Sequence, residues 1–204
     1  AMEPTSRETN ESRSYHHGDL RRALIEAAVV AIAERGPAAV SLRELARRVG
    51  VSHAAPAHHF GNKTGLLTAV AAEGYRRLSA ALREAYEATG SFLEVGVAYV
   101  RFAVTNRAYF DVMFRPDLLR LDDPELAEAR AAAREMLYPP AAEVTGAGPG
   151  DETLYAGVAA WSLAHGLATL WVTGNLPPAI GEDPEAAARA VLAHLAGPPP
   201  RSDG

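Results

Sequence analysis

Apolar side chains recur every three to four positions along most of this chain, the spacing expected of α-helices that bury one face. No stretch alternates apolar and polar residues with the two-residue period of a half-buried β-strand. The pattern therefore predicts an all-α protein of about nine helices. The longer helices are predicted at residues 19–35, 63–88, 92–114, 123–138, 152–173 and 184–196.

The segment 41–67 predicts two short helices and the start of a third. In the first helix, one face repeats apolar residues at i, i+3, i+4 and i+7, namely Leu42, Leu45, Ala46 and Val49. Ser41 and Glu44 have the S-x-x-E spacing of a capping box, which would open this helix by reciprocal hydrogen bonds. Gly50 can adopt the left-handed conformation that ends a helix without steric cost. Ser52 is then the predicted N-cap of the second helix.

This second helix, which we expect to end at Phe60, is too short to be stable by its own packing, so we expect it to be presented to a partner. Pro56 and Phe60 lie four positions apart and are predicted to face the preceding helix. The outward stripe then consists of His53, Ala54, Ala57 and His58. Asn62 is the predicted cap of the next helix, which starts at Lys63. These features are typical of a helix-turn-helix, whose second helix enters the major groove of DNA.

Residues 15–78 resemble the DNA-binding domain of the TetR family of transcriptional regulators. The resemblance rests on the order of the capped helices, the G-V-S turn at 50–52, H-F at 59–60 and K-x-x-L-L at 63–67. It implies an N-terminal three-helix helix-turn-helix domain and a C-terminal helical domain for ligand binding and dimerisation. It also implies a ligand-responsive homodimer that binds double-stranded operator DNA, whose sequence we expect to be palindromic because the protein would be two-fold symmetric.

The family's DNA-binding positions fall on these residues of the chain: Ser41, Arg43, Ser52, His53, Ala54, Ala55, Ala57, His58, His59 and Lys63. Arg43 matches a position that reaches a base edge, where arginine pairs bidentately with guanine. Positions that contact phosphates are matched by Ser41, His59 and Lys63. Base readout is expected at His53, Ala54, Ala55 and His58. The alternative for each is an ordinary solvated side chain, which the motif disfavours for Arg43 and Lys63.

Ala57 departs from the family pattern, because most relatives carry a tyrosine there that points at a phosphate. The resemblance therefore implies that this protein has lost one phosphate contact or has moved it to His58.

The stretches WSLAHGLATLW at 161–171 and YFDVMF at 109–114 resemble a TetR subgroup with a W-x-x-x-H-G signature in its C-terminal domain. Pockets between bundle helices are common ligand sites. The residues predicted to line such a pocket are Phe102, Tyr109, Phe110, Met113, Phe114, Trp161, His165 and Trp171. Their mostly apolar character predicts a small hydrophobic effector. Two alternatives stay open, since aromatic residues at helical spacing also form ordinary core, and His165 can be a core histidine bonded to a backbone carbonyl.

The predicted helices at 152–173 and 184–196 are apolar on more than one face, which predicts a second buried face against another subunit. The resemblance implies the same arrangement, a homodimer in which these two helices of each subunit form a four-helix interface. Small side chains suited to close helix approach recur at Ala156, Ala160, Ala164 and Ala168. The sequence leaves open whether this row faces the partner or the subunit's own core.

Charge divides the chain into two parts. The net charge is −5 overall, but residues 12–80 carry ten Arg and Lys against five Asp and Glu, a balance of +5. Residues 81–204 carry nine against seventeen, a balance of −8, and the first eleven residues contribute −2. This asymmetry predicts a basic, DNA-facing end and an acidic body that repels phosphate.

The expected domain organisation follows from these patterns. We expect a disordered arm at 1–14, the helix-turn-helix domain at 15–62, a linking helix at 63–88, the ligand-binding and dimerisation domain at 89–196 and a flexible tail at 197–204. Within the larger domain, the Pro- and Gly-rich residues 139–151 predict a flexible connection between helices.

Several function classes are disfavoured by composition and motifs. The absence of cysteine excludes disulfides and thiolate chemistry, and no run of eighteen apolar residues predicts a membrane span. The polar N-terminus predicts no signal peptide, so a cytoplasmic location is expected. Neither His16-His17 nor His58-His59 has the spacing of a metal site, and no metal or cofactor is expected. Motifs of hydrolases and metalloproteases are also absent from the sequence, which predicts that the protein is not an enzyme.

Three hypotheses remain for function. The first is a dimeric DNA-binding repressor released by a small hydrophobic ligand. The second is an activator or a ligand-independent regulator with the same fold. The third is a helical ligand carrier or enzyme, which would lack the steep salt dependence of DNA binding.

Overall fold

The computed structural model describes residues 6–146 and 148–194, with side chains described from Asp19 onward, apart from those of residues 144 and 145. The described residues form ten α-helices and three short 3-10 turns, and they contain no strand, which confirms the all-α prediction. The helices are α1 (Ser6–Arg35), α2 (Leu42–Val49), α3 (Ala55–Phe60), α4 (Lys63–Thr89), α5 (Phe92–Thr105), α6 (Arg107–Met113), α7 (Pro124–Glu135), α8 (Tyr138–Thr145), α9 (Asp151–Val172) and α10 (Pro184–Ala193). The turns are η1 (Pro37–Ala39), η2 (Pro116–Leu118) and η3 (Pro178–Ile180).

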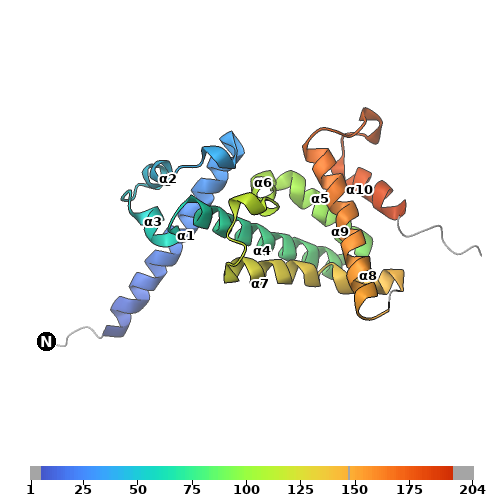
Figure 1. The fold of residues 1–204 in the computed structure, drawn as a ribbon, viewed down its shortest axis with the longest axis horizontal. Coiled ribbons are helices and arrows are strands. Elements are labelled where there is room, and N and C mark those ends of the chain that lie inside the picture. The colour runs from blue at the N-terminus through green and yellow to red at the C-terminus, as the bar shows by residue number, and fades with distance from the viewer. Residues whose placement is uncertain (1–5, 147, 195–204) are drawn as a thin grey trace, which may run out of the picture.

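Helices α1, α2 and α3 gather at one end of the molecule, and α4 runs from this group into a second group of helices (Figure 1). Leu24 and Ala28 of α1, Leu45 of α2 and Leu66 of α4 are fully or almost fully buried, and Phe60 of α3 joins them in the same core. Burial of these apolar side chains supplies the main stabilisation of the small domain, since α2 and α3 are too short to persist alone.

Helix α1 begins at Ser6, well before the predicted start at Asp19, and so includes residues 6–14 of the predicted disordered arm. The local reason is that neither proline nor glycine interrupts the chain from Ser6 to His17. The remaining residues of the predicted arm, 1–5, lie outside the described part of the chain.

Helix α4 is the spine of the fold. Asn62 caps it by accepting a hydrogen bond from the Gly65 N–H (3.0 Å), and Lys63 is its first residue, as predicted. The helix packs along α7, α5 and α6 (Figure 1). Gly74 allows α6 to approach closely, because a β carbon at this position would lie 2.6 Å from the Met113 sulfur. The same helix therefore contributes to the small N-terminal domain and to the body.

The body is built around α5, which packs against α4, α9 and α10. Val95, Tyr99, Val100 and Ala103 of α5 are almost completely buried. Helices α7 and α10 start as the sequence predicts, with Asp123 and Asp183 as N-caps followed directly by proline.

The prediction of one helix at 92–114 is wrong, because Asn106 divides it into α5 and α6. The backbone of Asn106 leaves the helical region (φ −118°, ψ 41°). Its N–H still bonds to the carbonyl of Phe102 in α5, while its own carbonyl accepts the N–H groups of Tyr109 and Phe110 in α6. Asparagine is well suited to such a break, since it favours positions at helix ends over helix interiors. The apolar periodicity continues through this break and does not reveal it.

The predicted flexible connection at 139–151 is also wrong over most of its length, because residues Tyr138–Thr145 form α8. Pro139 and Pro140 lie in the first turn of this helix, where the missing N–H groups have no helical partner to lose. Prolines that suggest the end of one helix therefore begin the next. The ring of Tyr138 packs against Gly157 of α9, where a side chain would not fit.

No helix in the described part of the chain is long and apolar enough to span a membrane. The tail predicted at 197–204 and the last two residues of the larger predicted domain, 195 and 196, lie outside the described residues.

Candidate nucleic-acid interface and ligand cavity

Helix α3 is held by its apolar side. Pro56 and Phe60 are buried, as predicted, while His53, Ala54, Ala57 and His58 are exposed. The helix begins at Ala55 and not directly after Ser52. The later start follows from Pro56, which then falls in the first turn, where no hydrogen bond is lost. Ser52 instead accepts the N–H of Ala55 through its carbonyl, in a turn that precedes the helix.

The turn between α2 and α3 has the predicted geometry. Gly50 is left-handed (φ 76°, ψ 32°), and its N–H bonds to carbonyls in the last turn of α2. The N–H of Val51 bonds to the Ala46 carbonyl (2.9 Å), which completes the helix end. These bonds fix the angle at which the chain leaves α2 towards α3.

The capping box predicted for α2 is wrong. Ser41 occupies the N-cap position but makes no side-chain hydrogen bond to the helix. The Glu44 carboxylate instead pairs with Arg35 of α1 (2.6 Å) and with Arg48 (2.9 Å). The hydrogen bond from Arg35, together with that from Arg48, holds the pKa of Glu44 below its usual value. Arg35 from the neighbouring helix and Arg48 from the next turn of α2 therefore outcompete the local cap for this carboxylate.

The arginines of α2 differ in what they contact. Arg48 pairs with Glu34 (2.7 Å) as well as with Glu44, so its charge is neutralised within the domain. Arg43 and Arg47 are exposed and have no carboxylate partner among the described residues. They lie one helical turn apart on the same side of α2. Arg47 was not assigned to DNA from the sequence, although its position off the buried face is consistent with such a contact.

The remaining predicted DNA-binding residues occupy varied environments. Ser41 and Ser52 are exposed, and Ala55 and His59 are half-buried. Lys63 is half-buried, and its ammonium donates a hydrogen bond to the Ala38 carbonyl (2.5 Å). One of its three N–H groups is therefore used in a hydrogen bond within the protein. The positive charge of Lys63 lies at the start of α4.

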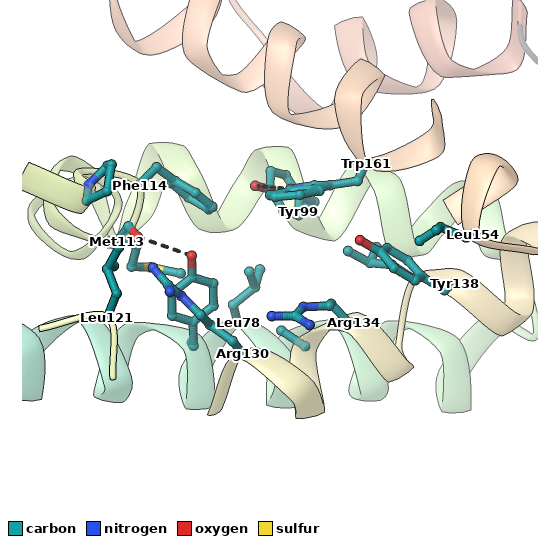
Figure 2. Close-up of a pocket in the computed structure, with 14 residues that line it drawn as sticks. Leu78, Tyr99, Met113, Phe114, Leu121, Arg130, Arg134, Tyr138, Leu154 and Trp161 are labelled. Carbon is teal, nitrogen blue, oxygen red and sulfur yellow. Dashed lines mark hydrogen bonds between the residues drawn. The ribbon is translucent and has the colours of Figure 1, made fainter. Parts of the chain in front are cut away.

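The body contains a cavity of about 500 Å³ that is bordered by α4, α5, α6, η2, α7, α8 and α9 (Figure 2). Its lining consists of Tyr75, Leu78, Tyr99, Met113, Phe114, Pro116, Leu121, Arg130, Ala133, Arg134, Leu137, Tyr138, Leu154 and Trp161. This volume lies in the range of natural small-molecule sites.

One side of the cavity carries a hydrogen-bonded chain. The Trp161 indole N–H donates to Tyr99 Oη (3.1 Å), and this hydroxyl lies 2.9 Å from His165 Nδ1. Burial lowers the pKa of His165, so its imidazole is neutral near pH 7. Burial also raises the pKa of the Tyr99 phenol, which therefore stays protonated within its hydrogen bond to Nδ1.

This chain explains the W-x-x-x-H spacing, because residues four apart on α9 both reach one hydroxyl on α5. The alternative in which His165 bonds to a backbone carbonyl is wrong, since its partner is the Tyr99 hydroxyl.

Three of the predicted ligand-binding residues line the cavity: Met113, Phe114 and Trp161. Phe110 and His165 pack directly behind Phe114, with ring centroids 5.1 Å and 4.4 Å from it. The other three, Phe102, Tyr109 and Trp171, do not line the cavity. Tyr109 packs under the Arg77 guanidinium instead, and Phe102 is buried in the core.

Most of the lining was not predicted, because much of it comes from α4, α7 and α8, which do not carry the aromatic motifs. Tyr75 and Leu78 continue the apolar spacing of α4, and nothing in the local sequence distinguishes a cavity wall from ordinary core. Arg130 and Arg134 share a face of α7, but only the tertiary structure turns that face towards the cavity.

Helices α9 and α10 leave small and apolar side chains exposed. The alanine row of α9 turns inward, with Ala164 and Ala168 buried and Ala156 and Ala160 half-buried. The exposed large apolar residues of α9 are Leu154, Tyr155, Val158 and Leu170, with Tyr155 66% exposed. Small exposed residues on α10 are Ala186, Ala190 and Ala193.

Comparison with known proteins decides the family. The family model described as "Tetracyclin repressor-like, C-terminal domain" matches residues 92–195, about half of the chain, and the model "Bacterial regulatory proteins, tetR family" matches residues 24–70. The chain belongs to the TetR family. The first match covers the body from α5 onward, with most of the cavity lining, and the second covers α2, α3 and parts of α1 and α4.

Individual TetR relatives agree with this assignment. An HTH-type transcriptional repressor of Mycobacterium tuberculosis is 40% identical over 68 residues, which are 32% of this chain and 36% of that protein. The alignment thus spans only about a third of the curated relative. A solved protein of unknown function from Rhodococcus sp. RHA1 is 34% identical, covers 89% of this chain and 96% of its own, and superposes with a TM-score of 0.74.

The TetR regulator PfmR from Thermus thermophilus shares the fold, with a TM-score of 0.62 and 24% identity over 85% of this chain and 96% of that one. At that identity the likeness concerns the fold alone.

Proposed function

We propose that this TetR-family protein is a sequence-specific DNA-binding transcriptional regulator whose α3 enters the major groove. The observation that carries the proposal is the placement of α3, which is anchored by Pro56 and Phe60 and turns His53, Ala57 and His58 to solvent. Exposed cations on the neighbouring α2 add the charge that phosphate contacts need. The family and its curated relatives favour a regulator over an enzyme.

The proposed DNA contacts have different purposes. Arg43 would read a guanine through its two parallel N–H groups, and Ser41, His59 and Lys63 would bind phosphates. The exposed residues of α3 and its preceding turn would face base edges. Since Ala57 offers no hydrogen-bond donor, α3 would depend more on His58 and on the cations of α2 for backbone contacts.

The proposed assembly is a homodimer through α9 and α10. Exposed apolar residues on α9 and an exposed alanine face on α10 provide the surface, and small side chains let helices approach closely. Two-fold symmetry would place two α3 helices on a palindromic operator, about 34–36 Å apart for successive major grooves.

We infer that the protein acts as a repressor released by a small, mostly hydrophobic ligand in the cavity. The curated Mycobacterium relative is a repressor, and the cavity is lined in part by α4, the helix that starts in the N-terminal domain. A ligand that binds differently to two arrangements of the helices shifts their populations, typically by about 1–3 kcal/mol of coupling. A ligand that fills the cavity and leaves operator affinity unchanged would rule this mechanism out.

The segment from Pro116 to Glu125 connects the two sites. Pro116 and Leu121 line the cavity, whereas Arg120 of the same segment donates to Asn62 Oδ1 (2.9 Å) at the junction of α3 and α4. At the end of the segment, Glu125 pairs with cations of α1 and α4. A ligand that displaces Pro116 or Leu121 would therefore disturb the contact that positions the start of α4 and the end of α3.

The proposed function is tested by the operator affinity of an Arg43→Ala variant. We expect the substitution to weaken operator binding by about 1–3 kcal/mol and to relax specificity at one base pair. The measurement is fluorescence anisotropy over a series of salt concentrations, with DNA identified by footprinting next to the protein's own gene. Affinity of the unsubstituted protein should fall steeply with salt, because phosphate contacts release counterions.

Arg83→Ala is the matched control for this experiment, since Arg83 is an exposed arginine on α4, outside the helix-turn-helix. It should change operator affinity little. An equal loss on all DNA sequences would make Arg43 a phosphate contact. The absence of salt-dependent DNA binding would favour a helical carrier, and binding that no small molecule alters would favour a ligand-independent regulator.

The proposed link between the segment from Pro116 to Glu125 and helix α3 is tested by Arg120→Ala. We expect faster amide hydrogen exchange in α3 and in the first turn of α4, because Asn62 loses the guanidinium that fixes it. Exchange in α9 should stay unchanged. Arg115→Ala removes a neighbouring arginine that pairs only with Asp117 in the same segment, and it should leave α3 as protected as before. Equal protection of α3 in both variants would contradict the link.

A further inference from the structure

Two cations stand on the wall of the cavity. Arg130 and Arg134 of α7 lie on the side opposite Tyr99, Phe114 and Trp161 (Figure 2). None of the 14 residues that line the cavity is an aspartate or a glutamate. The otherwise apolar and aromatic cavity therefore has a wall with positive charge.

Neither arginine has a carboxylate partner among the described residues, whereas arginines on other helices do. Arg48 and Arg189, for example, each pair with two glutamates. The Arg130 guanidinium lies over the ring of Tyr75, 5.5 Å from its centroid, and this contact does not neutralise the charge. Helix α7 also places no acidic residue three or four positions from either arginine.

The spacing of the two arginines increases the attraction of this wall for an anion. Residues four apart are neighbours on a helix surface, and like charges at this spacing repel each other. An anion held between the two guanidinium groups would relieve that repulsion and would receive charge-assisted hydrogen bonds. Arg130 is half-buried and Arg134 is exposed, so the anion would sit at the open side of the cavity.

The rest of the cavity lining offers few polar groups. The Trp161 N–H and the Tyr99 hydroxyl are used within their own hydrogen-bonded chain, and the Tyr75 hydroxyl donates to the Met113 carbonyl (3.1 Å). Leu78, Met113 and Phe114 add apolar side chains to the lining. Since polar atoms without partners are costly to bury, the part of a ligand that packs against these residues must be apolar.

We propose that the effector of this cavity is an apolar molecule with a single carboxylate, held by Arg130 and Arg134 while its hydrocarbon or aromatic body packs against Tyr99, Phe114 and Trp161. The proposal rests on the proposed ligand-responsive function and assigns the chemical class of its ligand. A guanidinium binds the two oxygens of a carboxylate in parallel, which gives orientation as well as affinity.

The test uses acids and alcohols with the same body. The full-length protein, without DNA, is titrated by calorimetry with decanoate and 1-decanol, and with 2-naphthoate and 2-naphthol. We expect at least one acid to bind about tenfold or more tightly than its alcohol, the factor expected from one or more charged hydrogen bonds. If neither acid binds, or if each acid binds no more tightly than its alcohol, the proposal is overturned.

Variants identify the groups responsible. Replacement of both arginines by glutamine, R130Q/R134Q, should abolish the preference for the acid and leave the alcohol's affinity within a few fold. R130K/R134K keeps both charges and should retain part of the preference. Arg83→Gln removes an exposed arginine outside the cavity and should retain all of it. Circular dichroism and thermal unfolding verify that each variant is folded, and a preference that survives in R130Q/R134Q overturns the assignment.

These outcomes can be separated from those for DNA binding. A protein that selects the acid but binds no operator would overturn only the proposed regulatory function. A protein that binds its operator but does not distinguish acid from alcohol would overturn only the assignment of the ligand class.

Discussion

Gly65→Ala is expected to abolish specific operator binding while the body of the protein stays folded. Gly65 lies in the first turn of α4, and a β carbon there would overlap the carbonyl oxygen of Phe60, the last residue of α3. It would also lie 3.1 Å from the Arg120 guanidinium. Because a backbone carbonyl cannot rotate away as a side chain can, α3 must move relative to α4.

The expected magnitude follows from the geometry of base readout. Specific binding exceeds non-specific binding by about a thousandfold or more, and it depends on α3 being held in one orientation. We therefore expect Gly65→Ala to lose at least about a hundredfold in operator affinity. The overpacking itself should lower the free energy of unfolding by about 1–3 kcal/mol.

Thr64→Ala is the control for the same helical turn. It removes side-chain atoms from the residue next to Gly65, whereas Gly65→Ala adds a β carbon. Anisotropy titrations of both variants, with circular dichroism to monitor helix content, give the comparison. A Gly65→Ala protein with unchanged operator affinity would show that the α3–α4 junction does not set the reading position.

Tyr99→Phe is expected to lower the free energy of unfolding by about 1–3 kcal/mol, the cost of leaving two half-buried polar groups without partners. The Tyr99 hydroxyl accepts from the Trp161 N–H and is hydrogen-bonded to His165 Nδ1, so its removal leaves both without this partner. Tyr99 is itself almost completely buried on α5. Replacement by phenylalanine keeps the ring and therefore isolates the hydroxyl.

The measurement is urea unfolding monitored by tryptophan fluorescence and circular dichroism. Tyr138→Phe is the matched control, since Tyr138 also lines the cavity but its hydroxyl has no hydrogen-bond partner among the described residues. It should change stability little. An equally small effect of Tyr99→Phe would mean that water replaces the hydroxyl and that the W-x-x-x-H spacing has no structural purpose.

The helix-turn-helix was predictable because its determinants are local. Gly50 ends α2 and Asn62 starts α4 through bonds to residues a few positions away. The periodicity that buries Pro56 and Phe60 and exposes Ala57 and His58 is a property of one short helix. Such features depend on residues that are close together in the sequence, so the local sequence is enough to predict them.

The wrong predictions arose where a local sequence pattern is compatible with two different structures. The apolar pattern of 92–114 continues across Asn106, so the break between α5 and α6 was missed. Pro139 and Pro140 are compatible with the end of one helix and with the first turn of another, and tertiary packing of Tyr138 on Gly157 accompanies the second outcome. Glu44 had a local partner in Ser41, but Arg35 of α1 bound it instead.

By itself, the sequence determined the all-α class, the buried and exposed sides of α3, and the separation of a basic end from an acidic body. The tertiary structure alone decided which residues surround the cavity, that Tyr99 joins Trp161 to His165, and that Arg130 and Arg134 face the cavity without a carboxylate. The physical reason is distance along the chain. Helix periodicity and capping act over three or four residues, whereas a cavity forms from side chains on helices whose relative placement depends on the packing of the whole core.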